Sequence, residues 1–194
     1  VRGATRAILE DRRPVRLDNL YLIGDRTHER LHLLPVLVGG RPNNDAVRLD
    51  TEAARAGRET RTKQGKPQAR RRLFTPSRLE VVELLDRQRM LPAICFIFSR
   101  NQCDEAARAC LAAGVRLTTG EDRERIRELA DARLGGMDPA DLAVLGYFDF
   151  VQGLSRGFAA HHAGMLPLFR EIVEELFTQG RIRAVFATET LALG

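Results

Sequence analysis

Polar side chains that could hold a phosphate backbone follow three apolar stretches of the sequence. Ser99 and Arg100 follow the first stretch, His161-His162-Ala163-Gly164 follows the second, and Thr188-Glu189-Thr190 follows the third. In a parallel sheet the carboxyl ends of the strands share one edge, where open α/β folds bind their ligands. Hydroxyls, a guanidinium, an imidazole and glycine amides all suit contact with sugar and phosphate. We therefore expect one phosphate-contacting crevice, without the groups that hydrolysis would need.

A capping box and an apolar run predict the elements around the first loop. Ser77-x-x-Glu80 matches the pattern in which two side chains satisfy the N–H groups at a helix start, so we expect a helix from Ser77 to about Arg89. The run Ala93–Phe98 is short and continuous, which predicts a strand covered on both faces. Asn101 is a good N-cap for a helix that follows this strand.

The rest of the chain continues the alternation of strands and helices. Cys103 and Cys110 fall on the apolar face of the helix after Asn101, so we interpret them as core residues. Alternation without tight hairpins favours an α/β fold with parallel strands and right-handed crossovers. The further elements that we expect are helices at 121–134, from 138 to about 151 or 154, and at 167–180, and strands at 157–161 and 182–188.

Composition limits the class of protein. A chain of 194 residues can bury roughly 70% of its unfolded surface without disulfides or metals. Its three cysteines are an odd number without a C-x-x-C pair, which favours reduced thiols over a disulfide framework or a zinc site. The longest apolar run has six residues, whereas a membrane helix needs about 20. Because no signal-peptide pattern opens the chain either, we expect a cytoplasmic protein without a membrane span.

Basic residues are concentrated in one stretch. Residues 41–72 hold ten Lys and Arg against four Asp and Glu, whereas the remainder holds 21 against 22. Because 39–72 contains few large apolar residues, we expect a disordered basic insertion there. We divide the chain into a linker at 1–38 that forms a β-ribbon from strands near 5–9 and 15–23, this insertion, and an α/β domain at 73–194. Both ends of the sequence look cut, so we expect a fragment.

Four ordered motifs resemble those of one family. The resemblance is to the second RecA-like domain of the superkiller-type DExH-box RNA helicases of superfamily two, with a basic composition similar to actinobacterial members. Val1-Arg-Gly3 and Arg13-Pro-Val-Arg-Leu17 resemble the linker that leads from the first RecA-like domain. The resemblance covers all but 39–72 and implies a partial, C-terminally truncated RecA-like domain. The four motifs are Phe96-Ile-Phe-Ser-Arg100, Gly157-Phe-Ala-Ala-His-His-Ala-Gly-Met-Leu-Pro167, Val173-Glu-Glu-Leu-Phe177 and Val185-Phe-Ala-Thr-Glu-Thr-Leu-Ala-Leu-Gly194.

The resemblance assigns roles to the residues of the strand-end loops. In the family these loops face the sugar-phosphate backbone of single-stranded RNA, so the resemblance implies single-stranded RNA, or DNA, as the partner of this chain. Glu189 has the wrong charge for phosphate, so we expect it to hold its neighbours in place. The implied nucleic-acid-binding residues are Ser99 and Arg100 in motif IV, then His162, Ala163 and Gly164 in the histidine-containing loop, and Thr188, Glu189, Thr190 and Gly194 at the start of motif V.

Several helicase motifs are missing from these 194 residues. The sequence contains no Walker A lysine motif and no Asp-Glu-x-His box, and it ends before motif VI. Phosphoryl transfer depends on these groups. The resemblance therefore implies an ATP-dependent helicase whose ATP and Mg²⁺ bind elsewhere, with the first RecA-like domain of the same protein as a partner. We expect no catalytic residue or metal ligand in this chain and no ATP hydrolysis by this chain alone.

Plainer interpretations of the same residues stay open. His161-His162 alone is a core or surface pair, since a metal site needs more ligands and His28 and His32 are distant in the sequence. Ser99-Arg100-Asn101 and Thr188-Glu189-Thr190, each taken alone, are ordinary helix caps. The alternative function is a non-enzymatic α/β module that binds nucleic acid through its basic stretch, for which a solvated linker is the plain interpretation.

Overall fold

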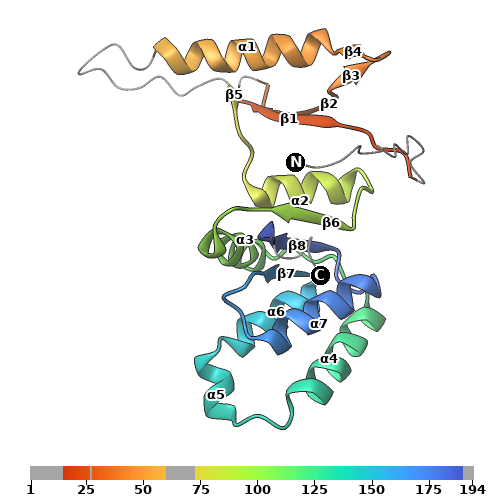
Figure 1. Ribbon diagram of the computed structural model, residues 1–194, viewed down its shortest axis with the longest axis vertical. Coiled ribbons are helices and arrows are strands. Elements are labelled where there is room, and N and C mark those ends of the chain that lie inside the picture. The colour runs from red at the N-terminus through yellow and green to blue at the C-terminus, as the bar shows by residue number, and fades with distance from the viewer. Residues whose placement is uncertain (1–14, 27, 60–72, 190–194) are drawn as a thin grey trace, which may run out of the picture. The chain divides into compact units, whose positions relative to one another are not determined.

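The computed structural model describes residues 15–26, 28–59 and 73–189, which belong to two compact units, Val1–Pro76 and Ser77–Gly194 (Figure 1). The first unit is built on an antiparallel sheet and the second on a parallel one. Each unit encloses its own buried apolar residues. Within the described residues, every helix is too short or too polar to cross a membrane.

The first unit is a three-stranded sheet covered by one helix. The strand order is β2-β1-β5 and both pairings are antiparallel. Leu49 of the helix packs with Ile23 and Leu73 of the sheet to form a small core. The elements are β1 (Leu20–Asp25), β2 (Arg30–Pro35), β3 (Leu37–Val38), β4 (Arg41–Pro42), α1 (Asn44–Glu59) and β5 (Leu73–Phe74).

Three expectations for the first unit are corrected. The ribbon partner of β1 is β2, and the expected strand at 5–9 lies outside the described residues. The prediction of disorder at 39–72 is wrong for β4 and α1, while 60–72 lies outside the described residues. Helix α1 forms because Asn43 Oδ1 accepts from the Asp45 N–H at 3.0 Å, and because Leu49 is buried against the sheet. Strand β5, which we had assigned to the second domain, pairs with β1 inside the first unit.

The second unit contains the predicted parallel sheet. Its strands are β6 (Ala93–Phe96), β7 (Phe158–His161) and β8 (Ala184–Ala187), in the order β6-β8-β7. Side chains alternate between two cores, so that Phe186 faces one layer of helices and Val185 faces the other. This arrangement confirms the predicted α/β fold, a partial RecA-like parallel sheet with flanking helices.

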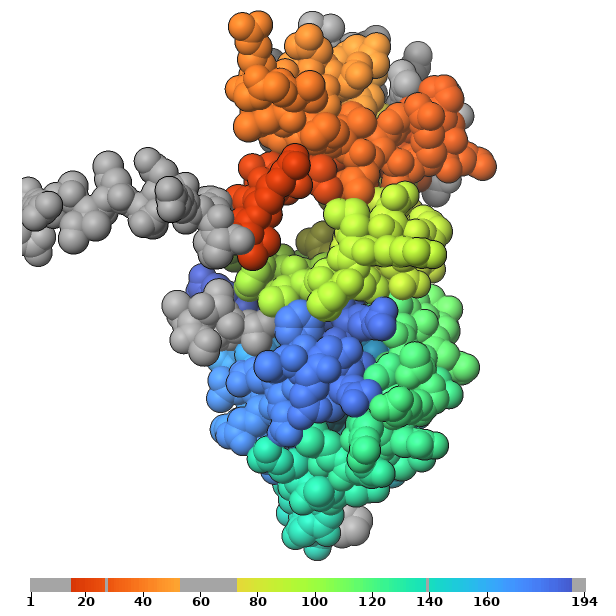
Figure 2. Space-filling view, turned by 90° about the vertical axis from the view of Figure 1, so that its right-hand side faces the viewer, coloured from red at the N-terminus to blue at the C-terminus, as the bar shows by residue number. Residues whose placement is uncertain are grey.

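Helices cover both faces of this sheet. Helices α2 and α3 supply Val82 and Cys103 to one core, while α4 and α7 supply Ile126 and Ile172 to the other. In Figure 2, α4 (green) and α7 (blue) lie side by side on one surface of the unit. The helices are α2 (Arg78–Arg87), α3 (Arg100–Ala112), α4 (Gly120–Leu134), α5 (Pro139–Val144), α6 (Tyr147–Arg156) and α7 (Pro167–Thr178).

Three local predictions differ from the structure. The N-cap of α3 is Ser99, whose Oγ accepts from the Gln102 N–H, and Asn101 lies inside the helix. The single helix expected after 138 is two helices, because Gly146 adopts a left-handed conformation with φ of 71° between α5 and α6. Strand β6 is covered on one face only, since Phe96 is 56% exposed.

The cysteines of α3 are core residues, as predicted. Cys103 and Cys110 are free thiols with no exposed surface. Burial raises the pKa of the Cys110 thiol to about 11, so this thiol stays protonated at neutral pH. These side chains therefore act by packing between α3 and the sheet.

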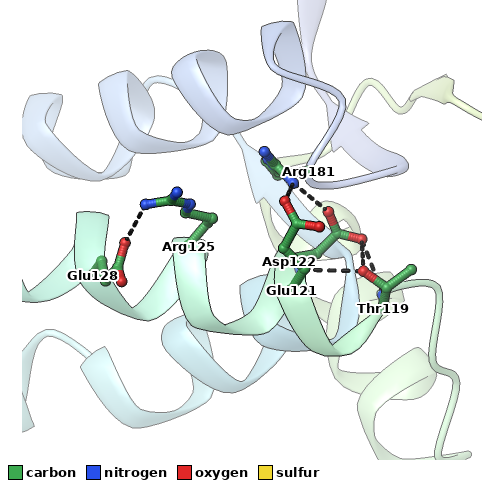
Figure 3. A network of polar contacts seen from close by, with 6 residues as sticks. All are labelled: Thr119, Glu121, Asp122, Arg125, Glu128 and Arg181. Atoms are coloured by element: carbon green, nitrogen blue, oxygen red, sulfur yellow. Dashed lines mark hydrogen bonds and ion pairs between the residues drawn. The ribbon is translucent and has the colours of Figure 1, made fainter.

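A polar network ties the start of α4 to the segment that enters β8 (Figure 3). Thr119 and Asp122 form a capping box, in which Asp122 accepts from the Thr119 N–H at 3.0 Å and from its hydroxyl at 2.8 Å. Arg181 donates to Asp122 at 3.0 Å and to Glu121 at 3.4 Å. Arg181 lies three residues before β8, so the network joins the start of α4 to the segment that leads into the central strand.

Replacing Asp122 with Asn should destabilise the second unit. Burial raises the pKa of Asp122, but the hydrogen bonds from Thr119 and the contact with Arg181 outweigh burial and hold this pKa below its ordinary value. We expect Asp122→Asn to lower the free energy of unfolding by about 1 kcal/mol at pH 7, measured by urea titration, because a helix cap and a charged partner are lost.

The pH dependence tests the same prediction. The carboxyl pKa of Asp122 is lower in the folded protein than in the unfolded chain, so ionised Asp122 stabilises the fold at pH values above the unfolded carboxyl pKa of about 3.9. This stabilisation is lost as the pH falls through the pKa of the folded protein. The difference between wild type and Asp122→Asn should therefore shrink in acid. Glu128→Gln, which removes the exposed pair with Arg125, is the matched control and should change the free energy of unfolding by less than about 0.5 kcal/mol. Equal effects of both variants would contradict the assignment.

Candidate nucleic-acid interface

The three predicted loops leave the sheet next to one another. Phe96 of β6 and His161 of β7 both align with Ala187 of β8, so the strands end at the same level. Two backbone hydrogen bonds extend this alignment beyond the strands, from the Ile97 N–H to the Ala187 carbonyl at 2.8 Å and from the Thr188 N–H to the His161 carbonyl at 3.1 Å. The loops after β6, β7 and β8 therefore begin along one edge of the sheet, and the strand arrows in Figure 1 point the same way.

His162 holds the loop after β7 against α3. Its imidazole is buried, and its Nε2 lies 3.0 Å from Asp104 Oδ1. The Gly164 N–H donates to His162 Nδ1 at 3.2 Å, so Nδ1 carries the lone pair and Nε2 carries the hydrogen in the neutral ring. Both ring nitrogens are thus used within the protein, and the Gly164 amide is used as well.

Gly164 also brings the first and second loops together. A Cβ on Gly164 would lie 3.2 Å from His162 Nδ1, which is a tight contact, and 3.5 Å from Arg100 Cδ, which is an ordinary contact distance, so Gly164 lies against both side chains. Arg100 is the first residue of α3 and is exposed. Its guanidinium is the cationic group that this arrangement offers to an anion, beside the N-terminus of a helix.

His161 points to the opposite side of the sheet from His162. Its ring is 1% exposed, and its Nε2 lies 2.7 Å from Glu174 Oε1 on α7. Because an ionised carboxylate only accepts, Nε2 carries the hydrogen. His161 Nδ1 is buried without a hydrogen-bond partner among the described residues. The two adjacent histidines therefore tie one strand end to α7 and the loop after it to α3.

The remaining predicted residues border the same edge. Ser99 is half-buried and caps α3, Ala163 is exposed in the loop after β7, and Thr188 is half-buried directly after β8. Glu189 is exposed, and its proposed holding role stays a prediction. The predicted residues Thr190 and Gly194 lie outside the described residues.

Sequence reasoning missed two carboxylates, Asp104 and Glu174. Asp104 lies four residues after Arg100 on α3, so helical spacing puts both on one face, but only the fold brings them to His162. Glu174 lies within the resembling motif Val173–Phe177 without a role of its own having been assigned. His28 and His32 lie in the first unit, where both contact Asp25. In the part of the chain that the structure describes, no three or more His, Cys, Asp or Glu side chains are grouped to hold a metal ion.

The parallel sheet, its two helical layers and the polar loops at the shared strand ends define part of a RecA-like domain. No family model matches the sequence. The chain is 45% identical over its whole length to "Probable helicase HelY" from Mycobacterium tuberculosis, of which it covers 22%. It is 35% identical over 64% of its length to the DExH-box ATP-dependent RNA helicase DExH11 from Arabidopsis thaliana, of which it covers 9%.

A human relative extends the same pattern. The chain is 33% identical over 76% of its length to superkiller complex protein 2 from Homo sapiens, of which it covers 11%. The chain belongs to the superkiller-type DExH-box helicases of superfamily two, with actinobacterial relatives that match along its whole length. It spans about a fifth of the length of those relatives.

The hydrogen bonds of His162 predict its tautomer. We expect ¹⁵N-resolved NMR spectra at neutral pH to show a protonated Nε2 and an unprotonated Nδ1, because Gly164 donates to Nδ1 and Asp104 accepts from Nε2. Asp104→Ala should broaden or shift the His162 signals, since the acceptor is lost. Glu105→Ala, a neighbouring change on the exposed side of α3, should leave them unchanged. A protonated Nδ1 in the wild-type protein would contradict the assignment.

Proposed function

We propose that this chain is part of an ATP-dependent RNA helicase and that its strand-end loops contact the backbone of the single-stranded nucleic acid. The observation that carries the proposal is the packing of Arg100 against Gly164, beside the loop that His162 holds in place. An exposed guanidinium at a helix N-terminus suits a phosphate, and hydroxyl groups suit any nucleotide alike. Family membership supports the same function.

The hydrogen bonds divide the work among these residues. We assign phosphate contact to Arg100 and to the hydroxyls of Ser99 and Thr188, because a hydroxyl that accepts a hydrogen bond, as Ser99 does from Gln102, can still donate its own hydrogen. His162 and Gly164 have positioning roles, because the bond between them occupies Nδ1 and the Gly164 amide while Asp104 occupies Nε2. This refines the expectation that an imidazole and glycine amides would touch the backbone directly.

ATP and Mg²⁺ belong to other parts of the proposed helicase. Mg²⁺ usually binds through one or two carboxylates together with substrate phosphates. At this edge Asp104 already accepts from His162, and no Walker A or DExH motif occurs in the 194 residues. The residues of this chain therefore do not fit an ATP–Mg²⁺ site by themselves. We assign that site to segments outside the chain, including the first RecA-like domain, in a cytoplasmic protein whose isolated 194-residue segment is inactive as an ATPase.

The alternative function is nucleic-acid binding through the basic stretch of the first unit. Six of the ten Lys and Arg between 41 and 72 fall in 61–72, where no acidic residue occurs. A cluster of this kind binds phosphate chains without help from a helicase fold. The proposed function requires the strand-end residues of the second unit for binding, whereas the alternative requires only the basic stretch. Binding measurements on variants therefore distinguish the two.

Arg100→Ala should weaken binding of a single-stranded RNA oligonucleotide to the chain. We expect roughly a tenfold loss of affinity for one charge-assisted hydrogen bond. The slope of log affinity against log salt concentration should fall by about 0.7, as for one phosphate contact. Thr188→Ala should lower the affinity without changing this slope, because a hydroxyl is neutral. Fluorescence anisotropy at several salt concentrations measures both quantities.

Two controls decide between the functions. Arg127→Ala removes one exposed positive charge from α4, which begins beside the amino end of β7, and should leave the slope unchanged. Changing the six basic residues of 61–72 to Gln tests the alternative while keeping α1. Complete loss of binding in that variant, with normal binding by Arg100→Ala and Thr188→Ala, would refute the proposed interface.

A further inference from the structure

A cavity of about 480 Å³ lies in the second unit, directly beside the candidate interface. It is lined by residues of α3, α6, β7 and the loop that enters α7, and it is open on one side. His162 and Gly164 form part of its wall, so it adjoins the loop that packs against Arg100. Small-molecule sites have volumes of roughly 300–1,000 Å³ and mostly apolar walls. Here the apolar wall includes Leu111, Phe158 and the stacked pair Phe150 and Phe169, whose ring centroids are 4.3 Å apart.

The edge of β7 provides polar backbone groups in this cavity. The Gly157 carbonyl accepts from the Ala184 N–H, and the His161 carbonyl accepts from the Thr188 N–H. In a parallel ladder alternate residues bond the same neighbour, so residues 157, 159 and 161 face β8. The N–H and carbonyl of Ala160 consequently point to the other edge, which lines the cavity. One donor and one acceptor are thus presented side by side.

The walls select against two kinds of ligand. Asp104 and Asp149 line the cavity together with Arg108, so two carboxylates disfavour a phosphate group there. An extended peptide would need several free backbone groups along the edge of β7, but α6 covers the neighbouring group on that edge, the carbonyl of Phe158. Gly153 sits so close that a Cβ there would lie 3.1 Å from the Phe158 carbonyl oxygen. What remains is space for a flat, uncharged group with its own donor and acceptor.

We propose that this cavity binds a nucleobase. A base has an apolar face for the wall of Phe150 and Leu111, and a donor–acceptor edge for the backbone of Ala160. Its amino or ring N–H groups suit the carboxylate of Asp149, which also lines the cavity. The inference rests on the proposed function in one respect, because a strand held by Arg100, next to the loop after β7, would place its bases beside the opening. A free nucleoside has the same chemistry, and the experiment separates the two sources.

A tryptophan reporter tests the cavity without any oligonucleotide. The chain contains no Trp, and Leu145 lines the cavity while its exposed neighbour Val144 does not. We expect adenosine to quench the fluorescence of Leu145→Trp in a saturable way and to leave Val144→Trp unchanged, whereas ribose 5-phosphate quenches neither. Equal behaviour of the two reporters, or quenching by a short apolar peptide in place of adenosine, would overturn the proposal.

A second pair of variants tests whether the base comes from a bound strand. Ala107 lines the cavity from α3, and Ala109 is exposed on the same helix outside it. We expect Ala107→Phe to reduce the affinity for an adenine oligonucleotide about tenfold, to the level of an abasic strand of the same length, and to leave abasic binding unchanged. Ala109→Phe should change neither affinity.

The outcomes distinguish this inference from the proposed function. If neither strand binds but adenosine quenches Leu145→Trp, the cavity is a free nucleoside site and the strand-contact function is wrong. If strands bind through Arg100 while adenosine does not quench the reporter, the nucleobase assignment is wrong and the interface stands. A misfolded Ala107→Phe variant does not remove the test, since the reporter measurement uses a substitution at an exposed position.

Discussion

The parallel pairing of β8 with both of its neighbours is the constraint on which the candidate interface depends. Phe96, Ala187 and His161 end their strands at one level because β8 bonds β6 on one side and β7 on the other. Each of the three strands has only four residues, so few backbone bonds fix the register. The two cores hold it instead. A slip of one residue would exchange Phe186 with Val185 and place each in a core shaped for the other.

The same ladder gives two adjacent histidines different partners. Successive residues at the end of β7 face opposite sides, so His161 reaches Glu174 on α7 while His162 reaches Asp104 on α3. Both helical layers are thereby attached to one strand end through imidazole–carboxylate hydrogen bonds. Successive residues of β7 also direct their backbone N–H and carbonyl groups to opposite edges of the strand, so those of Ala160 point away from β8 and toward the cavity. Interface, histidine pair and cavity are therefore consequences of one hydrogen-bonding pattern.

The sequence predicted helices and strands correctly where local features, such as caps and apolar runs, favour the same structure as the packing of the whole unit. The Ser77 capping box and Pro167 at the start of α7 give helices at the expected places, and apolar runs give β6, β7 and β8. It failed where two signals compete. Ser99 and Asn101 are both good caps, and only the path of the chain out of β6 selects Ser99. Helix α1 depends on a distant sheet that buries Leu49, and the cavity depends on α6 reaching the edge of β7. Neither contact has a local signature.

The net charge of each unit and the position of its individual charged side chains have different consequences for binding a phosphate chain. The first unit carries 17 Lys and Arg against 9 Asp and Glu, whereas the second carries 14 against 17. In the proposed function, a net negative unit does not attract a phosphate chain from a distance, so we assign the grip to a few donors at contact range such as Arg100. In the same proposal, attraction over longer distances, which salt screens, is assigned to the basic first unit. A protein proposed to step along a strand must release each nucleotide after holding it. A few donors that act only at contact range, on an otherwise acidic unit, would suit that requirement.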